Sequence, residues 1–134
     1  MISHKIRQGL SKTINVVTRP SDAYITDKAT IDYLLSTPAL ISMIIDGSCE
    51  LLHQLIPDDY TTVGYNINLS HTNPTVIGEK VTIKITVSKV EGNRIFLDVI
   101  GHDSGGVICQ GKYERVIVNK QKLMEKAYKR TSFM

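Results

Sequence analysis

Residues 63–78 read VGYNINLSHTNPTVIG, and the fold can be worked out from this stretch. Its first half alternates between apolar and polar side chains, the period of a strand with one face on a core. The alternation predicts an inward row made of Val63, Tyr65, Ile67 and Leu69. The next position in that row is His71, after which Asn73-Pro74 takes the chain out of the strand. A histidine there is either buried and hydrogen-bonded to backbone, or suited to acid–base chemistry near neutral pH.

Strand patterns also occur on both sides of this stretch. Residues 80–90, KVTIKITVSKV, alternate strictly, and Glu91-Gly92-Asn93 predicts a hairpin turn after them. The predicted strands cover residues 12–18, 61–71, 80–90, 94–102 and 107–118. Residues 28–35 are expected to form one or two helical turns, and residues 119–129 a terminal helix.

One long amphipathic helix is predicted between the first strand and the others. Thr37 is expected to cap it, with Pro38 at the first helical position, and Pro57 marks its end. At about 100° per residue, apolar side chains share one broad face. They are Leu40, Ile41, Ile44, Ile45, Cys49, Leu51, Leu52, Leu55 and Ile56. The polar face carries Ser42, Asp46, Glu50, His53 and Gln54.

The order of strand, long helix and four further strands defines an α+β fold. Short connections make the strands mostly antiparallel, and the apolar face of the sheet needs one cover. The predicted architecture is a curved antiparallel sheet wrapped around one long helix, the hot-dog fold, as a single domain over residues 1–134. The open edges of such a sheet favour pairing into a homodimer, which could assemble further into a higher oligomer.

The composition excludes several classes of protein. Apolar residues make up 42% of the chain and charged residues 22%, as in soluble globular proteins. No run approaches the roughly 20 apolar residues of a membrane span. The net charge is +3, and the basic residues gather at both ends. We interpret these as solvated ends. An anionic small ligand is an alternative. Binding of nucleic acid is not expected, because the basic residues are not interleaved with aromatic residues.

Cysteine and histidine usage gives no sign of a metal or other cofactor. The two cysteines, Cys49 and Cys109, have neither metal-ligand nor disulfide spacing, which predicts a reducing, cytoplasmic setting. His4, His53 and His102 have no partner motif and are expected to lie on the surface.

Three segments resemble the fluoroacetyl-CoA thioesterase-like family of hot-dog proteins. They are STPALISMI at the helix start, TTVGYNINLSHTNPTVIGEKVT across the second long strand, and VEGNRIFLDVIGHDSGGVICQGKYERVIVN in the last hairpins. The strongest signal is the spacing of seven residues from Gly64 to His71 and seven more to Gly78. The resemblance covers residues 36–127 and implies a dimer that acts on acyl-CoA thioesters.

The resemblance also implies site residues. Thr37 and His71 match the family's catalytic threonine and histidine, Gly64 a glycine lining the site, and Arg115 the arginine of its last strand. The family's catalytic glutamate is absent, because Ile45 stands at its position and Asp46 follows.

Each of these residues also has a structural alternative. Thr37 would serve as a helix cap, although the N–H groups of a helix N-terminus could also bind an oxyanion. Asp46 would be a solvated carboxylate on the polar face of the helix. Gly64 would form a bulge. Arg115 would pair with an acid near Glu114 or on a dimer partner.

The predicted function is hydrolysis of a small acyl-CoA thioester, with Thr37, His71 and Asp46 as catalytic candidates and Gly64, Ile45 and Arg115 as substrate-binding candidates. Activity is expected to be weak because of Ile45. The alternative is an acyl-CoA-binding hot-dog protein without catalysis. A hot-dog dehydratase is a third class, whose histidine and aspartate motifs are not found.

Overall fold

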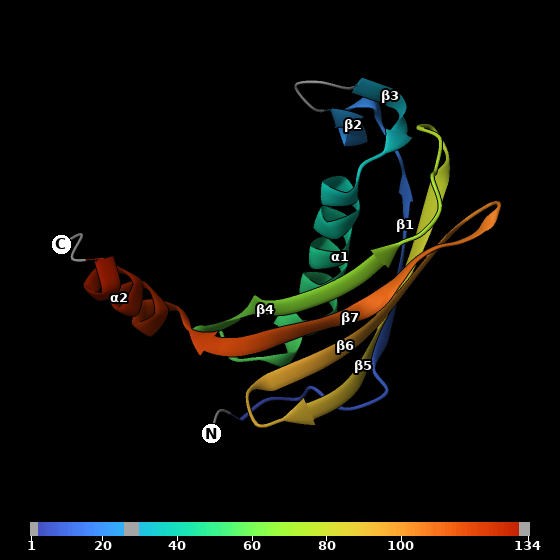
Figure 1. The fold of residues 1–134 in the computed structure, drawn as a ribbon. Coiled ribbons are helices and arrows are strands. Elements are labelled where there is room, and N and C mark those ends of the chain that lie inside the picture. The colour runs from blue at the N-terminus through green and yellow to red at the C-terminus, as the bar shows by residue number, and fades with distance from the viewer. Residues whose placement is uncertain (1–2, 26–29, 132–134) are drawn as a thin grey trace.

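The computed structural model describes residues 3–25 and 30–131, which form a curved sheet around a central helix (Figure 1). The long elements are β1 (Ser11–Val17), α1 (Thr37–Leu52), β4 (Tyr60–His71), β5 (Lys80–Glu91), β6 (Arg94–Asp103), β7 (Gly106–Asn119) and α2 (Lys120–Thr131). The main sheet has the order β1-β5-β6-β7-β4, and every neighbouring pair in it is antiparallel. The predicted fold class is confirmed.

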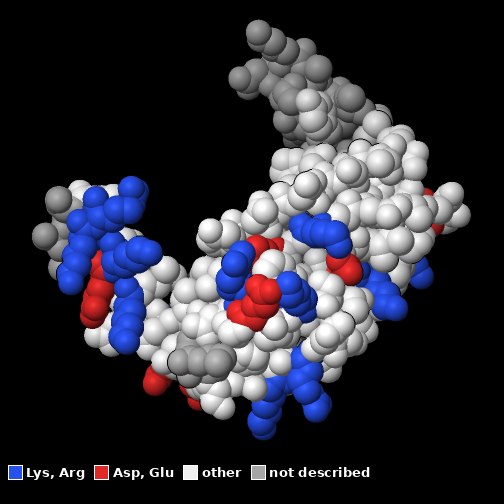
Figure 2. Space-filling model, turned by 60° about the horizontal axis from the view of Figure 1, so that its bottom comes forward, with Lys and Arg blue, Asp and Glu red and all other residues white. Residues whose placement is uncertain are grey.

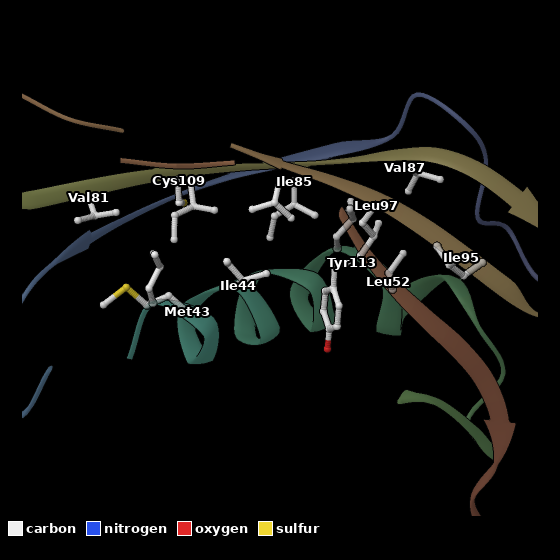
Figure 3. Close-up of a cluster of buried hydrophobic side chains, with 14 of the residues drawn as sticks. Met43, Ile44, Leu52, Val81, Ile85, Val87, Ile95, Leu97, Cys109 and Tyr113 are labelled. Atoms are coloured by element: carbon white, nitrogen blue, oxygen red, sulfur yellow. The ribbon is translucent and has the colours of Figure 1, made fainter. Parts of the chain in front are cut away.

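The core lies between the concave face of the sheet and α1 (Figure 3). From α1 it takes Leu40, Ile44 and Leu52, which are fully buried. They pack among the inward row of β5, where Val81, Ile83, Ile85 and Val87 are all buried. Gly47 lets the helix approach the sheet, because a Cβ at this position would lie 2.8 Å from a terminal carbon of Ile85. The strict alternation of residues 80–90 therefore reports the face of β5 correctly.

In β4 the predicted inward row is wrong over its first half, because the strand contains a β-bulge. The register with β7 shifts between Gly64 and Asn66, which places an extra residue in β4. The bulge moves Tyr65 outward, where 70% of it is exposed. Before the bulge, Thr62 is the buried residue, and after it the predicted Ile67 and Leu69 pack against the core.

Two further expectations near the start of α1 are corrected. Residues 30–35 are not helical but form strand β3 (Thr30–Leu35), which pairs with β2 (Ala23–Ile25) after a short 3-10 turn, Pro20–Asp22; residues 28–29 lie outside the described part. The cap of α1 is Ser36, whose Oγ accepts a hydrogen bond from Ala39 N–H at 3.1 Å. Thr37 is thus a helical residue, and its hydroxyl is free to bond elsewhere.

The two ends of α1 lie at opposite ends of β4. The first turn of the helix meets His71, while a second 3-10 turn, His53–Leu55, follows the helix and meets Thr62. The helix therefore runs antiparallel to β4. No helix in the described part of the chain is long and apolar enough to cross a lipid bilayer.

Candidate active site

A pocket of about 380 Å³ opens at the N-terminal end of α1. Its walls come from β2, β3, the first turn of α1, the end of β4 and the loop that follows it, and they are largely apolar. The lining residues are Tyr24, Leu34, Leu35, Thr37, His71, Thr72, Asn73 and Pro74. The site is held in place by backbone hydrogen bonds from β3 to the loop after β4, such as Leu35 N–H to Thr75 O at 2.9 Å. Two predicted site residues, Thr37 and His71, therefore share one pocket.

Thr37 and His71 are in direct contact. Thr37 Oγ1 lies 2.8 Å from His71 Nδ1, so the hydroxyl can donate to the ring when the histidine proton is on Nε2. Nε2 itself is buried and has no hydrogen-bond partner among the described residues. A neutral imidazole in this tautomer can accept a proton at Nδ1, but no carboxylate of residues 3–25 or 30–131 holds its other nitrogen.

The helix N-terminus offers fewer donors than the sequence suggested. Pro38 has no N–H, Ala39 N–H bonds to the Ser36 hydroxyl, and Leu40 N–H bonds to the Ser36 carbonyl at 3.1 Å. In the first helical turn this leaves the N–H of Thr37 as the group able to face a ligand. Stabilisation of an oxyanion by this helix end would therefore rest on one donor.

Gly64 and Arg115 form a second cluster, at the other end of β4. Gly64 pairs with Arg115 across β4 and β7, whereas His71 pairs with Cys109. Gly64 and His71 are seven positions apart, roughly 23 Å at about 3.3 Å per residue of strand. Within one chain the structure therefore does not bring these two predicted site residues to the Thr37–His71 pocket.

Arg115 is a buried cation without a carboxylate partner in the described part of the chain. It is 4% exposed. Its Nε donates to Thr62 Oγ1 at 2.9 Å, Nη2 to Thr62 O at 2.6 Å, and Nη1 to the Tyr113 hydroxyl at 2.5 Å. The alternative of an ion pair near Glu114 is not formed among the described residues, where the Glu114 carboxylate bonds Arg94 at 2.6 Å. The buried guanidinium is thus hydrogen-bonded only to neutral acceptors, although burying its charge is costly.

Gly64 is required by this cluster. A Cβ at Gly64 would lie 2.8 Å from the Tyr113 hydroxyl oxygen. The glycine therefore serves a close approach to Tyr113, and it also adjoins the bulge that was its structural alternative.

His53 lies on the surface, as expected, but it also belongs to the same cluster. Its Nε2 lies 3.2 Å from Thr62 Oγ1. Partial burial, and then the charge of Arg115, lower the pKa of His53. No motif marks this residue in the sequence, because its partner is nine residues away across the end of the helix.

Neither Ile45 nor Asp46 lines the His71 pocket. Asp46 lines a separate groove of about 720 Å³ between α1 and β1, together with Lys12, Arg19 and Glu50. Ile45 is 37% exposed, at the edge of the apolar face. Neither residue is brought to His71 within one chain.

The curved antiparallel sheet around α1 defines the chain as an α+β protein of the hot-dog fold. Residues 18–121 match the FlK family, described as fluoroacetyl-CoA-specific thioesterase, and the chain belongs to that family. A comparison with curated protein sequences gave no match.

Solved structures agree with this fold. A hot-dog-like protein from Thermanaerovibrio acidaminovorans is 29% identical over 92% of this chain and 91% of its own, with a TM-score of 0.84. A thioesterase superfamily member from Thermus thermophilus is 19% identical over 96% of this chain and 94% of its own, at 0.85. The fluoroacetyl-CoA thioesterase FlK is 21% identical over 93% of this chain and 97% of its own, with a TM-score of 0.87. Variants of FlK have been crystallised with acetyl-CoA, and with fluoroacetate and CoA.

Proposed function

We propose that this protein hydrolyses the thioester bond of a small acyl-CoA. The observation that carries the proposal is the 2.8 Å contact between Thr37 Oγ1 and His71 Nδ1 at a largely apolar pocket of about 380 Å³. Membership of the thioesterase family and the CoA ligands of FlK support the substrate class. The walls of Leu34, Leu35 and Pro74 suit a short acyl chain.

In this proposal His71 moves the proton that hydrolysis requires. Nδ1 accepts a proton from the attacking oxygen, which belongs to Thr37 or to a water molecule in its place. That oxygen bonds to the thioester carbon, the carbon–sulfur bond breaks, and His71 returns the proton to the leaving thiolate. If Thr37 attacks, a second round with water releases the acid. The products are a carboxylic acid and free CoA thiol.

A homodimer that pairs along β4 would complete this site. β4 is the last strand of the sheet and has no neighbour on its outer side in the described part of the chain. A two-fold axis between Ile67 and Asn68 of β4 would set two copies antiparallel. Gly64 of one protomer would then lie beside His71 of its partner, which joins the two halves of the predicted site. Light scattering at micromolar concentration should give twice the chain mass of 14.9 kDa.

The second candidate function is acyl-CoA binding without hydrolysis. It is favoured by Ile45, which replaces the family's glutamate, and by the buried Nε2 of His71, which has no partner among the described residues. Without a carboxylate to orient the ring, general-base catalysis loses part of its effect, which is about 10²–10⁴ in rate when complete.

Thiol release separates the two functions. Acetyl-, fluoroacetyl- and longer acyl-CoAs are incubated with the wild type and with His71→Ala, and free thiol is measured while binding is followed by calorimetry. Hydrolysis by the wild type that His71→Ala removes supports the thioesterase. Binding without thiol release at any chain length refutes it and leaves the binding protein.

A further inference from the structure

The terminal helix α2 carries a concentration of positive charge that the rest of the chain lacks. It contains five basic residues and one acidic residue, a net charge of +4, whereas the whole chain carries +3. One concavity of about 440 Å³ is lined by four of these basic residues and by the acidic residue, namely Lys122, Glu125, Lys126, Lys129 and Arg130. None of the four basic residues takes part in an ion pair within the part of the chain that the structure describes. Like charges at this helical spacing repel, so an anion would stabilise the group.

The helix also stands away from the body. Figure 1 shows α2 beyond the start of β4, on the side away from α1, and Figure 2 shows its basic side chains on a lobe of their own. No residue of the helix is fully buried, and Met124 is 50% exposed. Only Leu123 of the described helix is partly buried, so most of the helix surface is open to solvent.

The place where α2 begins relates it to the proposed dimer. Asn119, the last residue of β7, pairs with Tyr60, the first residue of β4, and Lys120 N–H bonds to Asp59 O at 3.0 Å. The helix thus leaves the sheet at the end of β4 opposite to His71. When two copies of β4 pair antiparallel, the start of one strand lies beside the end of the other. This holds for any register that pairs most of the strand, so α2 of one protomer comes to the His71 pocket of its partner.

We propose that the basic face of α2 binds the phosphate groups of the acyl-CoA whose thioester lies in the partner's pocket. This inference rests on the proposed function and adds a binding surface to it. The acyl end of the substrate is uncharged and suits the apolar pocket, whereas its nucleotide end carries a diphosphate and a 3′-phosphate. Lysine and arginine side chains projecting from one helix face are suited to such an anion. The helix is about 18 Å long at 1.5 Å per residue, so its charges extend outward from the pocket mouth.

The first test compares substrates with and without the nucleotide. The variant is Lys122→Gln/Lys126→Gln/Lys129→Gln, and the matched control is Lys5→Gln/Lys80→Gln/Lys84→Gln, which removes the same charge from exposed positions elsewhere. The α2 variant should raise KM for acyl-CoA about tenfold with kcat unchanged, as expected for loss of three exposed charge contacts. KM for the corresponding acyl-pantetheine should stay the same, and the control should behave as the wild type. An equal rise of KM for both substrates, or no rise, overturns the proposal.

The second test asks which protomer supplies the helix. Heterodimers of the α2 variant with His71→Ala contain one intact His71, and the α2 of its own chain is the neutralised one. If α2 acts across the interface, that site meets the intact helix of the other chain, and KM for acyl-CoA stays at the wild-type value. A KM raised to that of the homodimeric variant would show that α2 acts within its own chain and would overturn the proposal.

Calorimetry keeps the inference separate from the proposed function. CoA and pantetheine are titrated into the wild type, the α2 variant and the control, with no hydrolysis needed. Weaker binding of CoA to the α2 variant alone, with pantetheine unaffected, supports the phosphate site even if no acyl-CoA is hydrolysed. Equal CoA affinity in all three proteins overturns it even if hydrolysis is rapid.

Discussion

The contact between Gly64 and Tyr113 allows a quantitative test of why β4 carries a glycine. In Gly64→Ala the new Cβ would lie 2.8 Å from the Tyr113 hydroxyl oxygen, which is closer than a carbon can approach. Tyr113 is buried, and its hydroxyl is held by Arg115 at 2.5 Å, so neither side chain can yield easily. Overpacking of this kind costs about 1–3 kcal/mol, less about 0.4–1 kcal/mol from the lower entropy of the unfolded chain.

The net expectation is a destabilisation of about 1 kcal/mol, or a fall in Tm of about 4 °C. The decisive measurement repeats the substitution in a Tyr113→Phe background, with denaturant unfolding of all four proteins. Without the hydroxyl the nearest contact becomes 3.4 Å, an ordinary van der Waals distance, so alanine should cost nothing there. The double-mutant cycle should give a coupling of about 1–2 kcal/mol. The same cost in both backgrounds would refute the steric explanation and leave the bulge as the cause.

Further predictions concern the site and its surroundings. His71→Ala should keep the fold and lower the rate of thiol release, measured as kcat on one acyl-CoA, by about 10²-fold or more. A rate above half that of the wild type would exclude His71 as the general base. The pKa of His53 is lower in the folded protein than in the unfolded chain. Above the pKa of the unfolded chain, the neutral histidine therefore stabilises the fold, and this stabilisation is lost as the pH falls from about 7 to 5. His53→Gln should flatten the stability profile over that range, in urea titrations at several pH values. Asp46→Asn should leave kcat unchanged, whereas Ile45→Glu should raise it and cost about 1 kcal/mol in stability because the isoleucine is partly buried. Loss of activity in Asp46→Asn would make Asp46 the catalytic carboxylate.

The parts of the fold that sequence patterns predict are those in which one physical requirement dominates. The inward row of β5 is strictly apolar because it lies against α1, and the alternation follows directly. The start of α1 is different, because Ser36 and Thr37 are both good caps and adjacent in sequence. Only the fold decides between them, since the hydroxyl of Thr37 has a competing partner in His71, 34 residues away. Residues 30–35 form a strand for a similar reason, because they pair with β2.

The bulge in β4 links the spacing of the site residues to the shape of the sheet. Gly64 and His71 are seven residues apart, an odd number, so a regular strand would point them to opposite faces. The extra residue between Gly64 and Asn66 restores the phase. The position of Gly64 then faces the buried Tyr113, and His71 faces Thr37 at the first turn of α1, so both lie on the concave side of the sheet. Antiparallel pairing of two copies preserves that side, and the glycine of one protomer can then approach the histidine of the other. A spacing that looks irregular for a strand is therefore what the proposed site, shared between two copies of β4, would require.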